Sequence, residues 1–225
     1  MREPGVRADS REGPRPLSRT GWAALAAAVL LANLAFLQLL WRPEPAVVVP
    51  GPRYSDDFQR DRIGPAFWSA GGQWQIRGGE LWSPAARNNP LWLRMRLPRD
   101  VAIEFDARSE SPSGDIKVEV FGDGRDHASG YVLIFGGWGN QVSAIARLDE
   151  HGADRKVRAD RRVVLGRNYH MRIERRGSEL RWYVDGERFL GFEDPSPLEG
   201  KGHDRFGFSS WDADLFFDNL RIEPL

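Results

Sequence analysis

Residues 169–186, YHMRIERRGSELRWYVDG, carry the pattern that decides the fold. Apolar and polar side chains alternate over Tyr169–Glu174 and again over Leu180–Asp185. A period of two predicts β-strands with one buried and one solvated face, here joined as an antiparallel pair. Asp185-Gly186 predicts a tight two-residue turn, because type I′ geometry needs positive φ at both central positions.

The same alternation recurs through residues 54–225, where short runs are separated by Gly, Pro, Asp and Asn. Gln73–Arg77 and Glu80–Ser83, joined by Gly78-Gly79, predict a second hairpin. Further strands are expected at Leu91–Leu97, Val101–Arg108, Asp115–Phe121, Tyr131–Phe135, Val142–Asp149, Arg205–Ser210 and Leu215–Glu223. Many strands without crossover helices predict an all-β fold, a two-sheet antiparallel sandwich.

A different pattern precedes this domain. Residues 21–41 form an apolar run that would span about 30 Å as a helix, which is close to the hydrocarbon thickness of a bilayer. We therefore expect one transmembrane helix over 21–41, preceded by a disordered tail over 1–20. Prolines favour an extended linker over 42–53, and the β domain then occupies 54–225.

The flanking charges predict the orientation of this helix. Five arginines precede it and fewer follow it, so the positive-inside rule places the N-terminus in the cytoplasm. We therefore expect a single-pass protein of the inner membrane whose C-terminal domain lies in the periplasm. A cleaved signal peptide is the alternative, although its apolar core is normally shorter than this run.

Composition limits the partners and the chemistry. The chain has 32 basic and 32 acidic residues, so no net positive charge favours nucleic acid, which we do not expect as a partner. It has no cysteine, which excludes disulfides and thiol chemistry. The stability of the exported domain must therefore come from its core.

Several segments together carry a family resemblance: Asp56-Asp57-Phe58 with Phe67-Trp68, Gly72–Ile76 leading into Gly79–Leu81, residues 169–186, and Phe217–Ile222. They resemble the concanavalin A-like lectin/glucanase superfamily, particularly bacterial exported domains near the laminin G-like and 3-keto-disaccharide-hydrolase-like modules. The resemblance covers nearly all of 54–225 and implies a jelly roll whose concave sheet often binds carbohydrate. Function needs its own argument from the site residues.

Trp138 is the leading candidate for sugar contact. Glycines flank it in FGGWGN, which leaves the indole uncovered and lets a ligand approach the backbone. A purely structural role for Trp138 is the alternative. The predicted ligand-binding set comprises Trp138, Tyr131 and Trp211 for stacking, with Glu104, Asp106, Glu119, Arg147 and Asp149 as hydrogen-bonding partners of hydroxyls. The leading hypothesis is a glycan or envelope-polymer binding domain without catalysis.

Two alternatives remain open at this stage. Glu104 and Asp106 share a face of one expected strand, and Glu119 lies on a strand that we expect beside it, so these carboxyls are candidates for glycoside hydrolysis. Glu104-x-Asp106-x-x-x-Glu110 is one residue longer than the similar laminarinase-like motif, which weighs against that particular catalysis. The second alternative is an envelope protein-interaction module.

Metal binding has one candidate. The resemblance implies a structural calcium ion held by Asp218, with backbone near Asp56 and Gly79; an ordinary turn hydrogen bond from Asp218 is the alternative. The histidines show no metal-ligand spacing. His127 and His151 fall in loops that could border a concave site, and we expect solvated turn residues there.

Overall fold

The computed structural model describes residues 18–40 and 45–225, in two compact units divided after Glu44. Helix α1 (Arg19–Leu40) forms the first, and its side chains are described up to Gln38. The Ser18 hydroxyl accepts the Gly21 N–H at 3.1 Å, which caps the start of the helix. In the described part of the chain, α1 is the one helix whose length and composition would let it cross a membrane. Most of the predicted tail, as well as Trp41 and the first linker residues, lie outside the described residues.

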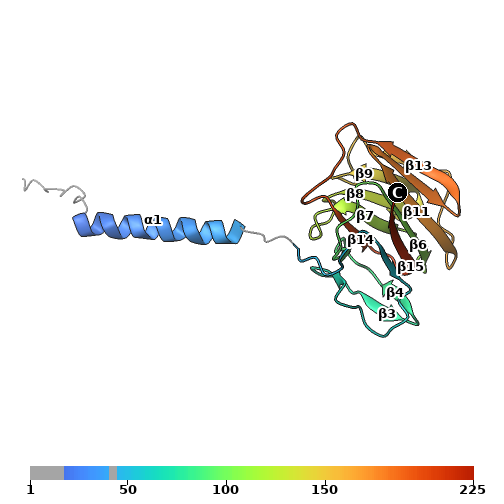
Figure 1. The fold of residues 1–225 in the computed structure, drawn as a ribbon, viewed down its shortest axis with the longest axis horizontal. Helices are drawn as coiled ribbons and strands as arrows, with labels where there is room; N and C mark the ends of the chain where they lie inside the picture. Colours follow the sequence, from blue (N-terminus) through green and yellow to red (C-terminus); the bar gives the residue numbers. More distant parts are fainter. Residues whose placement is uncertain (1–17, 41–44) are drawn as a thin grey trace, which may run out of the picture. The chain divides into compact units, whose positions relative to one another are not determined.

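The second unit consists of two antiparallel sheets, which confirms the predicted all-β sandwich (Figure 1). One sheet has the order β13 (Glu187–Glu193), β12 (Glu179–Val184), β11 (Asn168–Arg176), β6 (Val101–Ser109), β15 (Leu215–Pro224), β4 (Glu80–Ser83), β3 (Gln75–Arg77), with β1 (Tyr54–Asp56) also on β15. The other has the order β10 (Lys156–Arg158), β9 (Val142–Arg147), β8 (Tyr131–Gly136), β7 (Ile116–Gly122), β14 (Arg205–Ser209), β5 (Leu91–Leu93), β2 (Phe67–Trp68).

Both predicted hairpins are present. β11 pairs with β12 from Met171↔Val184 onward, so the alternation in 169–186 sets the register. Asp185 and Gly186 have φ of 54° and 81° and join β12 to β13, as a type I′ turn requires. The strand expected over Leu91–Leu97 is shorter, ending at Leu93, and the one-turn helix α2 (Gly137–Asn140) was not expected.

The core lies between the sheets and is aromatic at its centre. Phe105 of β6, Phe208 of β14 and Phe217 of β15 contact one another, with ring centroids 4.5 Å apart for Phe208 and Phe217 and 5.6 Å for Phe105 and Phe208. All members of the core cluster lie between Phe58 and Ile222. The second unit therefore forms its hydrophobic core from its own residues.

The domain begins earlier in the sequence than expected. The N–H groups of Val48 and Val49 donate to the Arg94 carbonyl at 2.8 and 3.1 Å, and the Arg94 side chain donates to the Ala46 carbonyl. Val49 also packs against the core. The later part of the predicted linker is thus attached to the domain, because it satisfies a backbone carbonyl that the short strand β5 leaves unpaired.

Glycine is required on the outer face of the seven-stranded sheet, where the Trp92 indole lies against Gly207. A Cβ at Gly207 would lie 2.8 Å from the ring. We expect Gly207→Ala to lower the free energy of unfolding by about 1–3 kcal/mol through overpacking. Gly64→Ala is the matched control, because its Cβ would meet no heavy atom closer than 4.0 Å. Urea unfolding of the two variants measures the difference, and equal values would contradict this packing argument.

Candidate functional site

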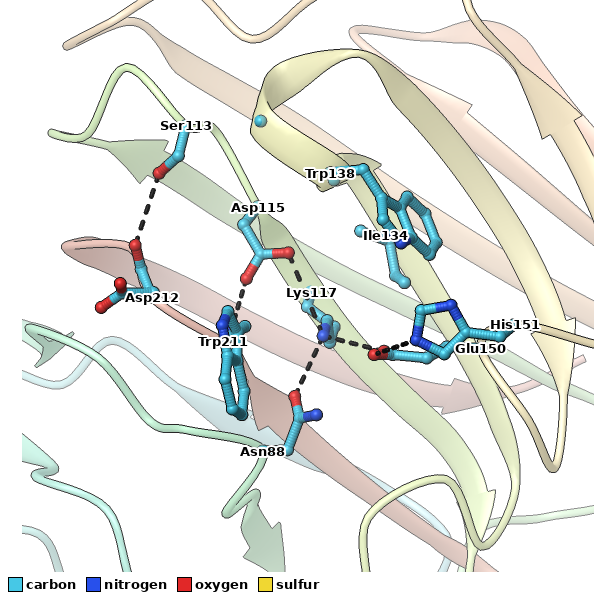
Figure 2. Close-up of a pocket in the computed structure, with 12 residues that line it drawn as sticks. Asn88, Ser113, Asp115, Lys117, Ile134, Trp138, Glu150, His151, Trp211 and Asp212 are labelled. Carbon is cyan, nitrogen blue, oxygen red and sulfur yellow. Dashed lines mark hydrogen bonds and ion pairs between the residues drawn. The ribbon is translucent and has the colours of Figure 1, made fainter.

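A cavity of about 370 Å³ opens on the outer face of the seven-stranded sheet (Figure 2). Its floor lies on β7 and β8, where Lys117 and Ile134 are register partners outside the core cluster. Loops that follow β4, β6, β8, β9 and β14 complete the walls. The lining residues are Asn88, Ser113, Asp115, Lys117, Ile134, Gly137, Trp138, Gly139, Glu150, His151, Trp211 and Asp212.

Trp138 forms one wall and is held there by an unusual turn. It has φ 50° and ψ 53°, between Gly136 and Gly139, which also have positive φ. A left-handed conformation is costly for a bulky residue and must be imposed by its surroundings. Asn140 supplies that constraint, because its amide donates to the Val163 carbonyl and accepts the Val163 N–H, both at 2.8 Å. The indole remains 37% exposed.

Trp211 forms the opposite wall and is 50% exposed. Its backbone N–H donates to Asp115 Oδ2 at 2.5 Å, and its backbone carbonyl accepts the Arg87 N–H. Figure 2 shows the two indoles on either side of Lys117. A sugar ring presents apolar C–H faces and polar edges, so two aromatic walls over a polar floor suit it chemically.

Lys117 is the centre of the floor, with only 2% of its side chain exposed. Its ammonium donates to Asn88 Oδ1 at 3.0 Å and to Glu150 Oε2 at 2.9 Å, and Asp115 Oδ1 lies 4.0 Å away. A buried ammonium needs such partners, because its transfer out of water is costly. The three partners come from separate loops, so Lys117 also fixes the shape of the cavity.

The charge network continues along the outer face of β7, beyond the residues that line the cavity. His127 Nε2 lies 3.4 Å from Glu150 Oε2, and its Nδ1 lies 2.6 Å from Glu119 Oε1. Glu119 is fully buried, and its other carboxylate oxygen accepts the Ala128 N–H at 2.8 Å. Carboxylates and cations therefore alternate from Asp115 through Lys117, Glu150 and His127 to Glu119.

The network shifts the pKa values of its members. Burial is the largest influence on His127 and would lower its pKa, but the hydrogen bonds to Glu119 and Glu150 outweigh it and raise the pKa to about 9. Burial would raise the pKa of Glu150, but His127 and Lys117 together lower it to about 2. Burial raises the pKa of Asp115 despite the nearby Lys117. At neutral pH His127 is therefore protonated and Glu150 ionised.

Trp138 and Trp211 are the members of the predicted ligand-binding set that line the cavity. Tyr131 does not, and its predicted stacking role was wrong. Its ring is fully buried in the core because it points inward from β8, and its hydroxyl donates to Asp194 Oδ2 at 2.6 Å. Arg147 binds the same Asp194 at 2.8 Å, away from the cavity. Asp149 accepts the His151 N–H at 2.8 Å and does not line the cavity.

Glu104 and Asp106 lie on the other sheet, so the predicted carboxylate cluster was wrong. β6 and β7 are consecutive in sequence but belong to opposite layers, and both strands turn their charged side chains outward. Glu104 pairs with Arg172, while Asp106 contacts His170 at 2.9 Å and accepts from Asn219 at 2.8 Å. Neither can act together with Glu119, whose own carboxylate is occupied and inaccessible.

Asp218 lies on β15 beside a small recess of about 90 Å³, on the face opposite to the cavity. Burial, followed by the negative charges of Glu80, Asp106 and Asp57, raises its pKa. Its carboxylate accepts the Asn219 N–H at 2.7 Å, as the turn alternative predicts. Among the described residues, no group of three or more His, Asp or Glu side chains is arranged to hold a metal ion. Calcium at Asp218 stays a prediction, to be tested by the effect of EDTA on the melting temperature.

Sequence reasoning missed the network around Lys117. The expectation of a solvated turn was wrong for His127, which is largely buried, whereas His151 is exposed. The alternation in β7 signals that Lys117 and Glu119 point away from the core. No such sequence pattern marks the loop residues Asn88 and Glu150 as partners of Lys117.

Comparisons with known proteins bear on this fold. No protein-family model matches the chain. The carbohydrate-binding module CBM66 from Bacillus subtilis superposes with a TM-score of 0.57 at 18% identity, covering 70% of this chain and 95% of that one. A prokaryotic beta-1,3-1,4-glucanase (lichenase) derived from a mouse hindgut metagenome also gives 0.57, at 10% identity, covering 78% and 100%. The fold is the concanavalin A-like jelly roll.

A curated relative matches part of the chain in sequence. An extracellular exo-alpha-L-arabinofuranosidase from Streptomyces chartreusis is 24% identical over 147 residues, which is 64% of this chain. The match spans only 18% of that enzyme. Known proteins with this fold thus include a binding module and an enzyme, and the site must decide between the two roles.

Proposed function

We propose that the concanavalin A-like domain is a glycan-binding module whose site is the cavity between Trp138 and Trp211. The observation that carries the proposal is the pair of exposed indoles on either side of a rigid, hydrogen-bonded polar floor. Walls of this kind pack on sugar rings, while Asp115 and Asn88 would hydrogen-bond hydroxyls. The comparisons support this role through the binding module that shares the fold.

We propose further that α1 anchors the domain in the inner membrane, with the N-terminus in the cytoplasm and the domain in the periplasm. The length of α1 and the arginines before it support this arrangement. Fractionation with carbonate extraction, combined with protease treatment of spheroplasts, tests it. A soluble, N-terminally shortened product would instead indicate a cleaved signal peptide.

Replacement of Trp138 tests the proposed binding site. We expect Trp138→Ala to raise the Kd for a bound glycan about tenfold or more, because an aromatic contact worth about 1.5 kcal/mol is lost. Titration calorimetry against arabinofuranosyl oligosaccharides and mixed-linkage β-glucan oligosaccharides measures this effect, since relatives act on such sugars. Trp68→Ala is the matched control, because Trp68 is exposed to a similar degree on β2 but does not line the cavity. Equal effects of the two substitutions would contradict the assignment.

Glycoside cleavage in the same cavity is the second candidate. Asp115 and Glu150 flank Lys117, and their distances of 4.0 and 2.9 Å from Nζ limit the separation of the two oxygens to about 7 Å, which lies within the range of glycosidase carboxyl pairs. Burial raises the pKa of Asp115, as a general acid requires, whereas the low pKa of Glu150 makes it a weak base. Release of reducing ends from a bound glycan, abolished by Asp115→Asn, would establish the enzyme.

A further inference from the structure

The cations around the cavity are already committed to partners within the protein. Lys117 is the one lysine or arginine among the lining residues of the described chain, and Glu150 and Asn88 hold its ammonium. His127 does not line the cavity and lies between Glu119 and Glu150. An anionic ligand would have to displace one of these carboxylates to obtain a positive partner.

The summed charge of the network also disfavours an anionic ligand. Glu119 and Glu150 balance Lys117 and protonated His127, so the remaining group, Asp115, decides the total. Whether Asp115 is ionised or protonated, the sum over these five groups is negative or neutral. In a partly buried cavity such charges are only weakly screened, so they act strongly on a ligand.

The arginines at the rim are engaged as well. Arg87 binds Asp212 at 3.1 Å and lies over the Trp211 ring, 5.5 Å from its centroid. Arg155 lies over the Trp138 ring at 4.7 Å and donates to the Glu150 carbonyl at 2.8 Å. Both guanidinium groups are thus already engaged with the walls of the cavity or with its loops.

We infer that the cavity selects uncharged sugars through their hydroxyl groups and rejects uronates and other anionic glycans. This inference rests on the proposed glycan-binding function. When ionised, Asp115 and Glu150 accept hydrogen bonds only, so they match hydroxyl donors and repel a ligand carboxylate. A neutral sugar keeps the Lys117 network intact, whereas a uronate places a further negative charge beside it.

The test compares matched ligands on the whole protein, purified in a detergent without a sugar headgroup. The probes are trisaccharides ending in glucose, galactose or arabinofuranose, and the same glucose and galactose compounds oxidised at C6 to uronates. We expect the uronates to bind at least about tenfold more weakly than their neutral parents at low salt. The difference in affinity between uronates and their neutral parents should decrease as salt increases, because ions screen the repulsion.

The outcomes separate this inference from the proposed function. Uronates that bind as tightly as their parents, or more tightly, overturn the charge selectivity while leaving a glycan-binding site. Uronate binding that is lost in Arg155→Gln would assign anion recognition to the rim and would also overturn it. If none of the probes binds, the proposed function fails and the inference fails with it.

A charge-altering variant provides a second measurement. Glu150→Gln keeps the shape of the side chain and removes one negative charge beside Lys117. We expect the ratio of uronate to neutral affinity to increase about tenfold. Asp149→Asn removes a neighbouring carboxylate that does not line the cavity, and it should leave the ratio unchanged. If Glu150→Gln is poorly folded by circular dichroism, Asp115→Asn replaces it with the same expected direction, measured at a pH high enough to ionise Asp115 in the native protein. An unchanged ratio in a folded variant overturns the inference.

Discussion

Substitution of Lys117 by methionine is expected to lower the free energy of unfolding by about 3–5 kcal/mol, because it removes one partner of a buried ion pair. Lys117 is almost fully buried, and without its ammonium Asp115 would lose its nearby cation and Glu150 would keep only the histidines as cationic partners. Methionine preserves the length and volume of the side chain, so the loss reports on charge rather than on a cavity. Urea unfolding of the fragment 45–225, followed by tryptophan fluorescence, measures the change.

A double substitution identifies the cause of this loss. Lys117→Met combined with Glu150→Gln removes both members of the closest pair, so it should be clearly more stable than Lys117→Met alone. If the two single losses simply add, the residues are not coupled and the central role of Lys117 is wrong. A loss below about 1 kcal/mol for Lys117→Met would show that water reaches the ammonium, as it does at surface pairs.

The sequence alone predicts the elements of the fold well, because local alternation carries the information. In 169–186 the apolar period sets both the strands and the register of β11 against β12, and Asp185-Gly186 fixes the turn. These features depend on neighbours in the chain. Short strands without alternation, such as β2 and β10, were not predicted because two or three residues show no period.

Alternation does not say which sheet a strand joins. β6 and β7 both show an inner apolar face and an outer charged face, so their charged residues looked like one cluster. The chain crosses between the layers after Ser109, and this crossing separates Asp106 from Glu119 by the whole core. Such pairing depends on contacts that are distant in sequence, which a single sequence does not display.

Of the candidate site, only the two aromatic walls were predicted from the sequence. Trp138 and Trp211 stand out because glycines or small polar residues surround them. The polar floor is assembled from Asn88, Lys117 and Glu150, which are far apart in the sequence, and each alone resembles an ordinary surface residue. Tyr131 shows the opposite error. It was predicted to stack on a ligand, but its side chain is buried in the core.

The domain is expected to lose about 2 kcal/mol of stability as the pH rises from 7 to 9.5. His127 has a pKa of about 9 in the folded protein, above the ordinary value of 6.5, because Glu119 and Glu150 bind its protonated form. A group whose pKa is raised by folding contributes its full stabilisation below its unfolded pKa. That contribution then disappears as the pH rises through the folded value. Urea unfolding at half-unit pH intervals measures the slope.

His127→Gln identifies the group responsible, because glutamine can still donate to one carboxylate but does not titrate. The variant should be less stable than the native protein at pH 7, and its stability should change little between pH 7 and 9.5. Tyr131 does not contribute in this range, because burial and Asp194 raise its pKa to about 12. A slope that persists in the variant would show that another group titrates. A flat native profile would mean that the imidazole is neutral, and the alternation of charges beside the cavity would then end at Glu150.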